Sequence, residues 1–542
     1  MTPTETFEHP VVRADEGRRR FLGQIGGVAL MMGWDALAVP GVFAATDATP
    51  ESLGVSSTAV SRFIDACAAG SFDMHSLIVA RRGQIAARGW WAPYRADTAQ
   101  SLYSLSKSFT STAVGFAITA GQLKLSDKVV DFFPDQSPPT VSAHLAALSV
   151  EHLLTMTVGQ ASDATPLVTR EHDWVKTFLA LPIEFAPGSV FLYNSASTYM
   201  LSAIVQKVTG EKLVDYLKPR LFDPLGLPAM RWSMCPRGIN TGGWGLSATT
   251  EALFRFGQFC LQHGQWNGDQ LLPAAWIEQA TRAHIQQPPA PGQMLEQAQQ
   301  TSDWHQGYGY QFWRCRHDAF RGDGAFGQFC IMLPKLDAVI AITSRTLDMQ
   351  GLLNLVWEHL LPGLHEAALP ADPTASNRLR QQLAGLTLQL PPGAAISPQR
   401  MRSRVYAIAT NALGVQRLGI AFDAGTCRLS FAVGERTHVI DTGVGRWRDG
   451  ETELPGTPPE FTELVGTFVS PKGPAKIAAA GAWKDADTFE MQWRYYETPH
   501  FDTVTLHFTG DAVEVRFLNS LTQMAAAVHA ETRPVLIGAA RA

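Results

Sequence analysis

The sequence predicts a mixed α/β domain with an inserted helical region, followed by a second, β-rich domain. Three observations support this fold class. Apolar strand-like runs occur at 76–90 and again at 328–343, helical spacing dominates between them, and alternating apolar and polar residues mark the end of the chain. A chain of 542 residues, of which 46% are hydrophobic and 17% charged, is long and apolar enough for two or three domains.

The first domain is expected over residues 50–365, and it begins with a helix and a hairpin. A helix is predicted over 57–69 because its apolar residues recur on one face, namely Val60, Phe63, Ile64 and Cys67. Strands at 76–80 and 85–90 follow, and Arg81-Arg82-Gly83 between them is typical of a hairpin turn.

The rest of this domain supplies further helices and two late strands. A helix is predicted from Ser104 to about Ile118, with Gly121 placed to end it. Strands are predicted at 328–333 and 338–343, and a closing helix at 351–361. Because strands lie at both ends and helices between them, we expect a sheet that both ends complete and a helical insertion in the middle.

The last third of the chain has a different pattern. A linker is expected at 366–400, where prolines and glycines interrupt the periodicity, and a β-rich domain is expected over 401–542. Its clearest alternating runs are 489–495, 504–508 and 513–517, which predict the strands of a small barrel or a sandwich. No motif in this domain indicates its role.

The first 45 residues resemble an export signal. Arg18-Arg19-Arg20-Phe21-Leu22 precedes a weakly apolar run at 25–32, and residues 42–45 follow with the small Ala44 and Ala45. This is the pattern of a twin-arginine signal peptide, with cleavage near Ala44 and a periplasmic location. The alternative is an amphipathic or disordered N-terminus, which Asp35 within the apolar region favours.

Composition excludes several partners. The formal net charge is −5 and no basic run stands out, so nucleic acid is not expected as a partner. No window beyond the N-terminus is apolar enough for a transmembrane helix. The six cysteines form no CxxC pair, and the 15 histidines show no ligand-like clustering, so neither a metal nor a cofactor is expected. The cysteines are interpreted as buried free thiols.

Ser104 and Lys107 carry the expected chemistry. On a helix, residues three apart lie on the same side, and a serine in the first turn lies at the positive end of the helix dipole. A lysine whose pKa is lowered by burial can take the hydroxyl proton and activate the serine. The alternative is a solvated helix start that matches by chance. The apolar strands before the pair and the apolar helix after it favour a site.

Five segments follow one another in a fixed order, at 102–110, 121–129, 153–159, 187–195 and 242–249. The first holds an S-x-x-K pattern, and the last is rich in glycine. Together they resemble the landmarks of serine β-lactamases, penicillin-binding proteins and their esterase relatives. The resemblance covers residues from about 55 to 362. It implies the β-lactamase/transpeptidase-like fold, an antiparallel sheet flanked by helices, and an acyl-enzyme on Ser104 activated by Lys107.

The resemblance also implies a second motif around Tyr193. Its phenol would lie near Ser104 and Lys107 and relay protons to the leaving group. The alternative is a core tyrosine. The family pattern often has Asn two residues after the tyrosine, whereas here Ser195 stands there and Asn194 one place earlier. Either of these two side chains is a candidate for substrate contact.

The third motif departs most from the family pattern. The best match is Gly322-Asp323-Gly324-Ala325, expected to open the edge strand beside the site. Relatives that recognise β-lactams usually have Lys or His at its first position, where this chain has Gly322. Arg321 should point to the opposite face of an extended strand. The resemblance therefore implies no clamp for a substrate carboxylate, and it assigns the oxyanion hole to the backbone N–H groups of Ser104 and Ala325.

Other features of this region leave alternatives open. Gly324 is expected to let the substrate backbone approach closely. Asp323 is expected to be a turn residue, with binding of a cationic substrate group as the alternative. Residues 322–327 also spell G-x-G-x-x-G, but the strand that follows argues against a dinucleotide site. An aromatic cluster precedes the motif and is either pocket or core: Trp304, His305, Tyr308, Tyr310 and Trp313.

These observations predict a serine hydrolase that acts on a small ester or amide, with an esterase or small amidase as the first hypothesis. A β-lactamase, D-aminopeptidase or DD-peptidase is the second. A catalytically silent binding or sensor protein on the same fold is the alternative from another class, and the joint presence of Ser104, Lys107 and Tyr193 argues against it.

Overall fold

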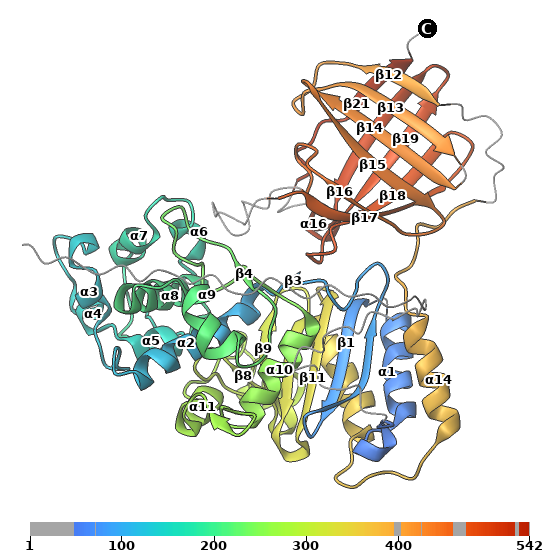
Figure 1. The fold of residues 1–542 in the computed structure, drawn as a ribbon. Helices are drawn as coiled ribbons and strands as arrows, with labels where there is room; N and C mark the ends of the chain where they lie inside the picture. Colours follow the sequence, from blue (N-terminus) through green and yellow to red (C-terminus); the bar gives the residue numbers. More distant parts are fainter. Residues whose placement is uncertain are drawn as a thin grey trace, which may run out of the picture. The chain divides into compact units, whose positions relative to one another are not determined.

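A six-stranded antiparallel sheet forms the centre of the first domain (Figure 1) in the order β2-β1-β11-β10-β9-β8. The computed structural model describes residues 48–70, 72–394, 403–423, 425–458, 473–525 and 530–540. The sheet strands are β1 (Asp73–Arg81), β2 (Gln84–Trp90), β8 (Trp313–Arg314), β9 (Phe320–Gly324), β10 (Gln328–Leu333) and β11 (Ala338–Arg345). The first strand pairs with the last, so both ends of the domain complete the sheet, as the sequence predicts.

Helices cover both faces of this sheet, and β1 is therefore buried on both sides. Ile78 and Ala80 face one core, whereas Leu77 and Val79 face the other. The second core contains α1 (Ser57–Ala69) and α13 (Met349–Leu355), which continues as a wider helical turn over Val356–Leu360. The first core contains α2 (Ser106–Thr119) and α10 (Thr250–Leu261). The predicted helices at both ends of the domain are therefore confirmed.

The hairpin between β1 and β2 is also confirmed. Arg82 and Gly83 both have positive φ, at 52° and 72°, which is the backbone twist that suits a two-residue hairpin.

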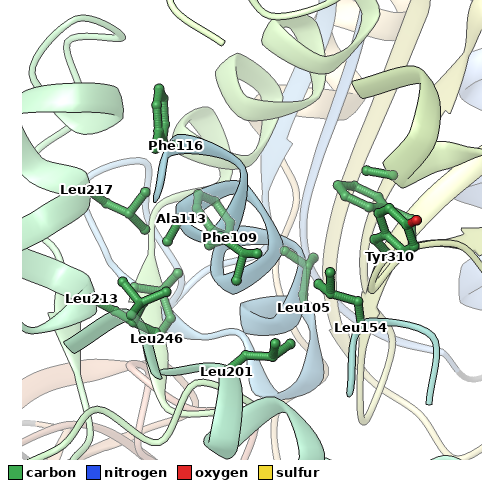
Figure 2. Packing of buried hydrophobic residues seen from close by; sticks show 14 of the residues in the cluster. Leu105, Phe109, Ala113, Phe116, Leu154, Leu201, Leu213, Leu217, Leu246 and Tyr310 are labelled. Atoms are coloured by element: carbon green, nitrogen blue, oxygen red, sulfur yellow. The ribbon is translucent and has the colours of Figure 1, made fainter. Parts of the chain in front are cut away.

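The inserted region between β2 and β8 is mainly helical and packs around α2. Its helices are α3 (Val129–Phe132), α4 (Ala143–Ala147), α5 (Val150–Leu154), α6 (Thr165–Val168), α7 (Trp174–Ala180), α8 (Ser195–Thr209), α9 (Leu213–Leu217), α11 (Ala274–Thr281) and α12 (Leu295–Thr301). Its short strands are β3 (Gln100–Ser101), β4 (Arg231–Trp232), β5 (Leu246–Ala248), β6 (Gln265–Trp266) and β7 (Asp269–Gln270). Figure 2 shows apolar side chains of this region meeting those of α2.

The C-terminal domain is a barrel, one of the two architectures that its alternating strands predict. Its ten strands are ordered β15-β14-β13-β12-β21-β20-β19-β18-β17-β16, and β15 also pairs with β17 to close the sheet. Side chains that alternate along each strand fill the interior, for example Phe489, Met491 and Trp493. Its elements are β12 (Arg404–Ile408), β13 (Val415–Asp423), β14 (Thr426–Val433), β15 (Arg436–Val444), β16 (Arg448–Thr452), β17 (Ala475–Trp483), β18 (Thr488–Arg494), β19 (Phe501–Thr509), β20 (Ala512–Asn519), α16 (Ser520–Ala525) and β21 (Leu536–Ala540).

The segment between the two domains contains a further helix, α14 (Pro373–Ala384). Gln382 donates a hydrogen bond to Asp65 on α1 at 2.7 Å, and Ser376 donates one to Glu51 at 2.7 Å. Within the expected linker at 366–400, residues 373–384 are therefore a helix packed on the first domain. The expected signal peptide at 1–45 lies outside the described residues.

Several simple features complete the description. All six cysteines are buried free thiols, as expected. Within the described ranges, no helix is long and apolar enough to cross a membrane. The same residues contain no group of three His, Cys, Asp or Glu side chains placed to hold a metal ion.

The packing of α2 makes a direct prediction about stability. Phe109 is fully buried, and its ring stacks on Phe256 at a centroid distance of 4.0 Å. Replacing Phe109 with Ala removes this contact and leaves a cavity, so we expect a loss of about 3–5 kcal/mol in the free energy of unfolding. Chemical denaturation followed by fluorescence measures it.

Phe185→Ala is the matched control, because the Phe185 side chain is 46% exposed. We expect this control to change stability by less than about 0.5 kcal/mol. Equal losses in the two variants would contradict the packing described for α2.

Candidate active site

Ser104 lies in a single helical turn, Tyr103–Leu105, that leads directly into α2. The helix is held in place by its apolar side chains: Figure 2 shows Leu105, Phe109, Ala113 and Phe116 surrounded by buried residues from other elements. The serine is therefore at the N-terminal end of a rigid buried helix, where the helix dipole favours negative charge.

Lys107 is one turn further along and is only 2% exposed. Its Nζ donates to Ser104 Oγ at 3.0 Å, to Ser195 Oγ at 2.9 Å and to the Gly243 carbonyl at 2.8 Å. Burial lowers the pKa of the Lys107 amine to about 7, and the carboxylates of Asp163 and Asp323 oppose this only in part. A substantial fraction of the amine is therefore neutral at neutral pH and can accept a proton.

Tyr193 completes the group around the amine. Lys107 Nζ lies 4.8 Å from the centroid of the Tyr193 ring, and the phenol is hydrogen-bonded with Ser104. Burial raises the pKa of the phenol, with a further contribution from Asp323, while the bond to Ser104 opposes the rise. The phenol therefore keeps its proton at neutral pH and can donate a hydrogen bond or pass a proton on.

The structure separates the roles of Asn194 and Ser195. Asn194 is fully buried, caps the N-terminus of α8 by accepting from Ala196 N at 3.0 Å, and donates to Gln160 at 2.6 Å. Ser195 instead accepts from Lys107. Of the two candidates, only Ser195 has its side chain at the Lys107 amine.

The third motif differs from its expected position. Gly322-Asp323-Gly324 closes β9 rather than opening a strand, and the turn after it leads into β10. The strand next to β9 on the outer side is the two-residue β8. The motif is therefore close to the edge of the sheet. The C-terminal end of β9 lies against the turn that leads into α2.

The two glycines of β9 face the first residues of α2 and the turn before it. A Cβ on Gly322 would lie 2.7 Å from Ser108 Oγ, and a Cβ on Gly324 would collide with the Leu102 carbonyl and lie 3.2 Å from Leu105 N. In the structure, packing against the helix start requires this glycine, a role separate from the expected approach of the substrate backbone. This close approach brings the end of β9, and with it Ala325, next to the turn that holds Ser104.

Asp323 is a strand residue, so its expected role in a turn is wrong. It forms a buried ion pair with Arg321 at 2.9 Å, and Arg321 is stacked over Trp304 at 4.4 Å. Both side chains lie on the face of β9 opposite the glycines. The Asp323 carboxylate neutralises the charge of the Arg321 guanidinium. Arg321 is therefore unsuited to bind a substrate carboxylate.

The aromatic residues divide between two buried clusters. Trp313 stacks on Tyr193 at 5.7 Å and lies with Tyr308 in a small buried cluster beside the site. Tyr310 belongs to the main core and donates to Glu151 at 2.7 Å. Trp313 therefore supports the position of the Tyr193 ring.

Two contributors to the site had no assigned role in the sequence. Gly243, in the last of the five landmarks, supplies the carbonyl that accepts from Lys107, and a Cβ there would lie 2.9 Å from the Ser195 carbonyl. The one sequence feature that could have pointed to Gly243 is the high glycine content of that segment. Asp163 gives no signal because it matches no motif, although its charge acts on Lys107.

The comparisons with known proteins identify the family of the chain. The family model described as Beta-lactamase matches residues 60–358, which is more than half of the chain, so this chain belongs to the beta-lactamase family. Its fold is the β-lactamase/transpeptidase-like fold with an additional C-terminal barrel.

Three curated relatives are similar at low identity. Penicillin-binding protein 4 of Amycolatopsis lactamdurans is 28% identical over 223 residues, covering 35% of this chain and 58% of that protein. Esterase EstB of Burkholderia gladioli is 29% identical over 171 residues, covering 28% and 43%. The 6-aminohexanoate-dimer hydrolase of Paenarthrobacter ureafaciens is 24% identical over 291 residues, covering 50% and 73%. The chain thus spans less than two thirds of the first two relatives.

The lowered pKa of Lys107 predicts the pH dependence of any hydrolysis in which this amine acts as the base. The folded-state pKa lies below the usual value of 10.5, so the reactive neutral amine forms as pH rises through about 7. We expect kcat/KM for an activated ester to rise about tenfold per pH unit below that point and to level off above it. Initial rates between pH 5 and about 9 measure this dependence. A profile that is still rising steeply at about pH 9 would refute the assignment.

The different positions of Ser195 and Asn194 predict opposite phenotypes. Ser195→Ala removes a partner of the amine, and we expect kcat/KM to fall by at least about tenfold at nearly unchanged stability. Asn194→Ala removes a helix cap, and we expect it to cost about 1 kcal/mol of stability. Paired kinetic and denaturation measurements distinguish them. Activity that depends on Asn194 but not on Ser195 would reverse the two roles.

Proposed function

We propose that this protein is a serine hydrolase that forms a covalent acyl-enzyme on Ser104, with small uncharged esters or amides as substrates. The observation that carries the proposal is the buried Lys107 amine, 3.0 Å from the Ser104 hydroxyl with a pKa lowered to about 7. Two matched relatives are named as an esterase and as a hydrolase of 6-aminohexanoate dimer, which supports hydrolysis of an ester or amide.

Acylation starts when neutral Lys107 takes the proton of Ser104 as Oγ attacks the carbonyl carbon of the substrate. The carbonyl π electrons move to oxygen, and we assign the N–H groups of Ser104 and Ala325 to the stabilisation of that oxyanion. When the tetrahedral intermediate collapses, the bond to the leaving group breaks. The leaving group takes a proton from Tyr193, which Lys107 replaces through the Ser195 hydroxyl.

Deacylation repeats these steps with water as the nucleophile. Water loses a proton to the Lys107–Tyr193 pair as it attacks the acyl carbon. Ser104 Oγ leaves and regains a proton from the same pair, and the acid product departs. Because the phenol keeps its proton at neutral pH, Tyr193 passes protons on and is not a standing base.

The surroundings of β9 support an uncharged substrate. At the position where the family resemblance leads us to expect a cation, the chain has Gly322 packed against Ser108. The neighbouring Arg321 is paired with Asp323 in a buried ion pair. A substrate carboxylate would therefore lose its water without gaining a charged partner here, which is unfavourable.

Labelling with a fluorophosphonate probe tests the nucleophile. We expect the wild type to be labelled and Ser104→Ala to remain unlabelled. Ser111→Ala is the matched control, because Ser111 lies on the same helix and its buried hydroxyl has no hydrogen-bond partner among the described residues. Labelling that survives Ser104→Ala would exclude Ser104 as the nucleophile.

A substrate panel tests the proposed class. We expect a p-nitrophenyl ester to be hydrolysed faster than a D-amino-acid amide, and a chromogenic cephalosporin to be turned over slowly. Rapid hydrolysis of the cephalosporin would show that the β9 surroundings do not exclude a carboxylate and would favour a β-lactamase.

A further inference from the structure

A loop of the C-terminal barrel contacts the residue that precedes Ser104. The two domains belong to one structural unit of the chain. The loop connects β18 to β19, and Tyr495 N–H donates to the His500 carbonyl at 3.1 Å to close it. His500 is 2% exposed, and its Nε2 lies 2.5 Å from the Tyr103 hydroxyl. A buried polar contact therefore connects the barrel to the turn that holds the nucleophile.

The same imidazole also packs against the residue that follows Ala325. The Phe326 ring lies edge-to-face on His500, with centroids 5.0 Å apart, and on Tyr103, with centroids 5.2 Å apart. We call Tyr103, Phe326 and His500 the aromatic brace. The brace flanks both residues whose N–H groups we assign to the oxyanion hole, since Tyr103 precedes Ser104 and Phe326 follows Ala325.

The backbone at these two flanking residues needs such support. Tyr103 and Phe326 have φ angles of 48° and 68°, in the left-handed region that bulky residues rarely adopt. Strained conformations of this kind persist only where surrounding contacts impose them. The Tyr103 carbonyl accepts from Ser106 at 2.6 Å and the Phe326 carbonyl from Ser344 at 3.0 Å, and the brace holds the two side chains.

The barrel loop is itself firmly attached to the first domain. Arg494, at the end of β18, forms an ion pair with Asp73 of β1 at 2.7 Å, and its side chain is only 5% exposed. The Glu497 carbonyl accepts from Ser101 N at 2.9 Å, just upstream of the nucleophile. The loop can therefore act as a fixed support.

The state of the His500 imidazole fits a structural hydrogen bond. Burial lowers its pKa to about 3, with Arg345 and His75 contributing, so the ring is neutral at neutral pH. Its Nδ1 lies 3.3 Å from Ser520 Oγ. Tyr103 and Ser520 therefore each contact one ring nitrogen. In the neutral ring one of these nitrogens donates a hydrogen bond and the other accepts one.

We propose that His500 is a positioning residue through which the C-terminal barrel holds Tyr103 and Phe326, so that the N–H groups of Ser104 and Ala325 converge on the substrate oxygen. This inference rests on the proposed serine hydrolase function. The oxyanion exists only in the transition state and the intermediate, so misplaced amides slow the reaction and leave substrate binding nearly unchanged. The barrel therefore contributes to kcat rather than to KM.

The test uses the full-length protein and three histidine variants. We expect His500→Ala to lower kcat for a p-nitrophenyl ester by tenfold to about a hundredfold, with KM changed by less than about threefold. His500→Gln keeps an amide that can reach the Tyr103 hydroxyl and should restore most of the lost rate. His507→Ala is the matched control, because His507 lies in β19 with an exposed side chain and should react like the wild type.

A second variant separates positioning from folding. Tyr103→Phe keeps the ring and removes the hydroxyl, so combined with His500→Ala it should cost less than the product of the two single effects. A wild-type kcat in His500→Ala overturns the inference. A loss that Gln does not restore and that follows a lower melting temperature also overturns it. A wild type that hydrolyses no substrate and is not labelled at Ser104 overturns the proposed function, and this inference with it.

Discussion

The burial of one amine, that of Lys107, is the constraint on which the rest of the site depends. A lysine removed from water favours its neutral form, and Lys107 is only 2% exposed. Three oxygen atoms lie within 3.0 Å of its Nζ. The amine is therefore shielded from water and still has hydrogen-bond partners. The partners come from the turn Tyr103–Leu105 before α2, from α8 and from the loop before β5, and these elements must pack closely for the amine to stay dry.

Glycines permit that close packing. Gly322 and Gly324 bring β9 against the start of α2, and Gly243 brings its loop against Ser195. The same contacts place the end of β9, near Ala325, beside the turn that holds Ser104. Fold and chemistry are thus coupled. A side chain at Gly322 or Gly324 would push β9 away from the residues around the Ser104 turn, and one at Gly243 would push its loop away from Ser195, a partner of Lys107.

Local patterns predicted the elements well, because apolar spacing and turn residues act over a few neighbours. The helix at 57–69, the hairpin after it and the two late strands all occur as expected. Packing between residues far apart in the sequence could be predicted less well. The sequence could not show that Gly324 meets the Leu102 carbonyl or that Asp323 pairs with Arg321, since both depend on which face of β9 meets α2. Contact between His500 and Tyr103 links residues that are 397 positions apart, and no local signal marks it.

The most direct test of the account is the mass of a trapped acyl-enzyme. The protein is mixed with a p-nitrophenyl ester, quenched in acid within the first turnover, and digested for peptide mass analysis. The account predicts that the acyl group is attached to Ser104 and that Lys107→Arg, whose guanidinium stays charged, accumulates almost none. An acyl group on another residue, or equal acylation of the Lys107→Arg variant, would contradict the central role of the buried amine.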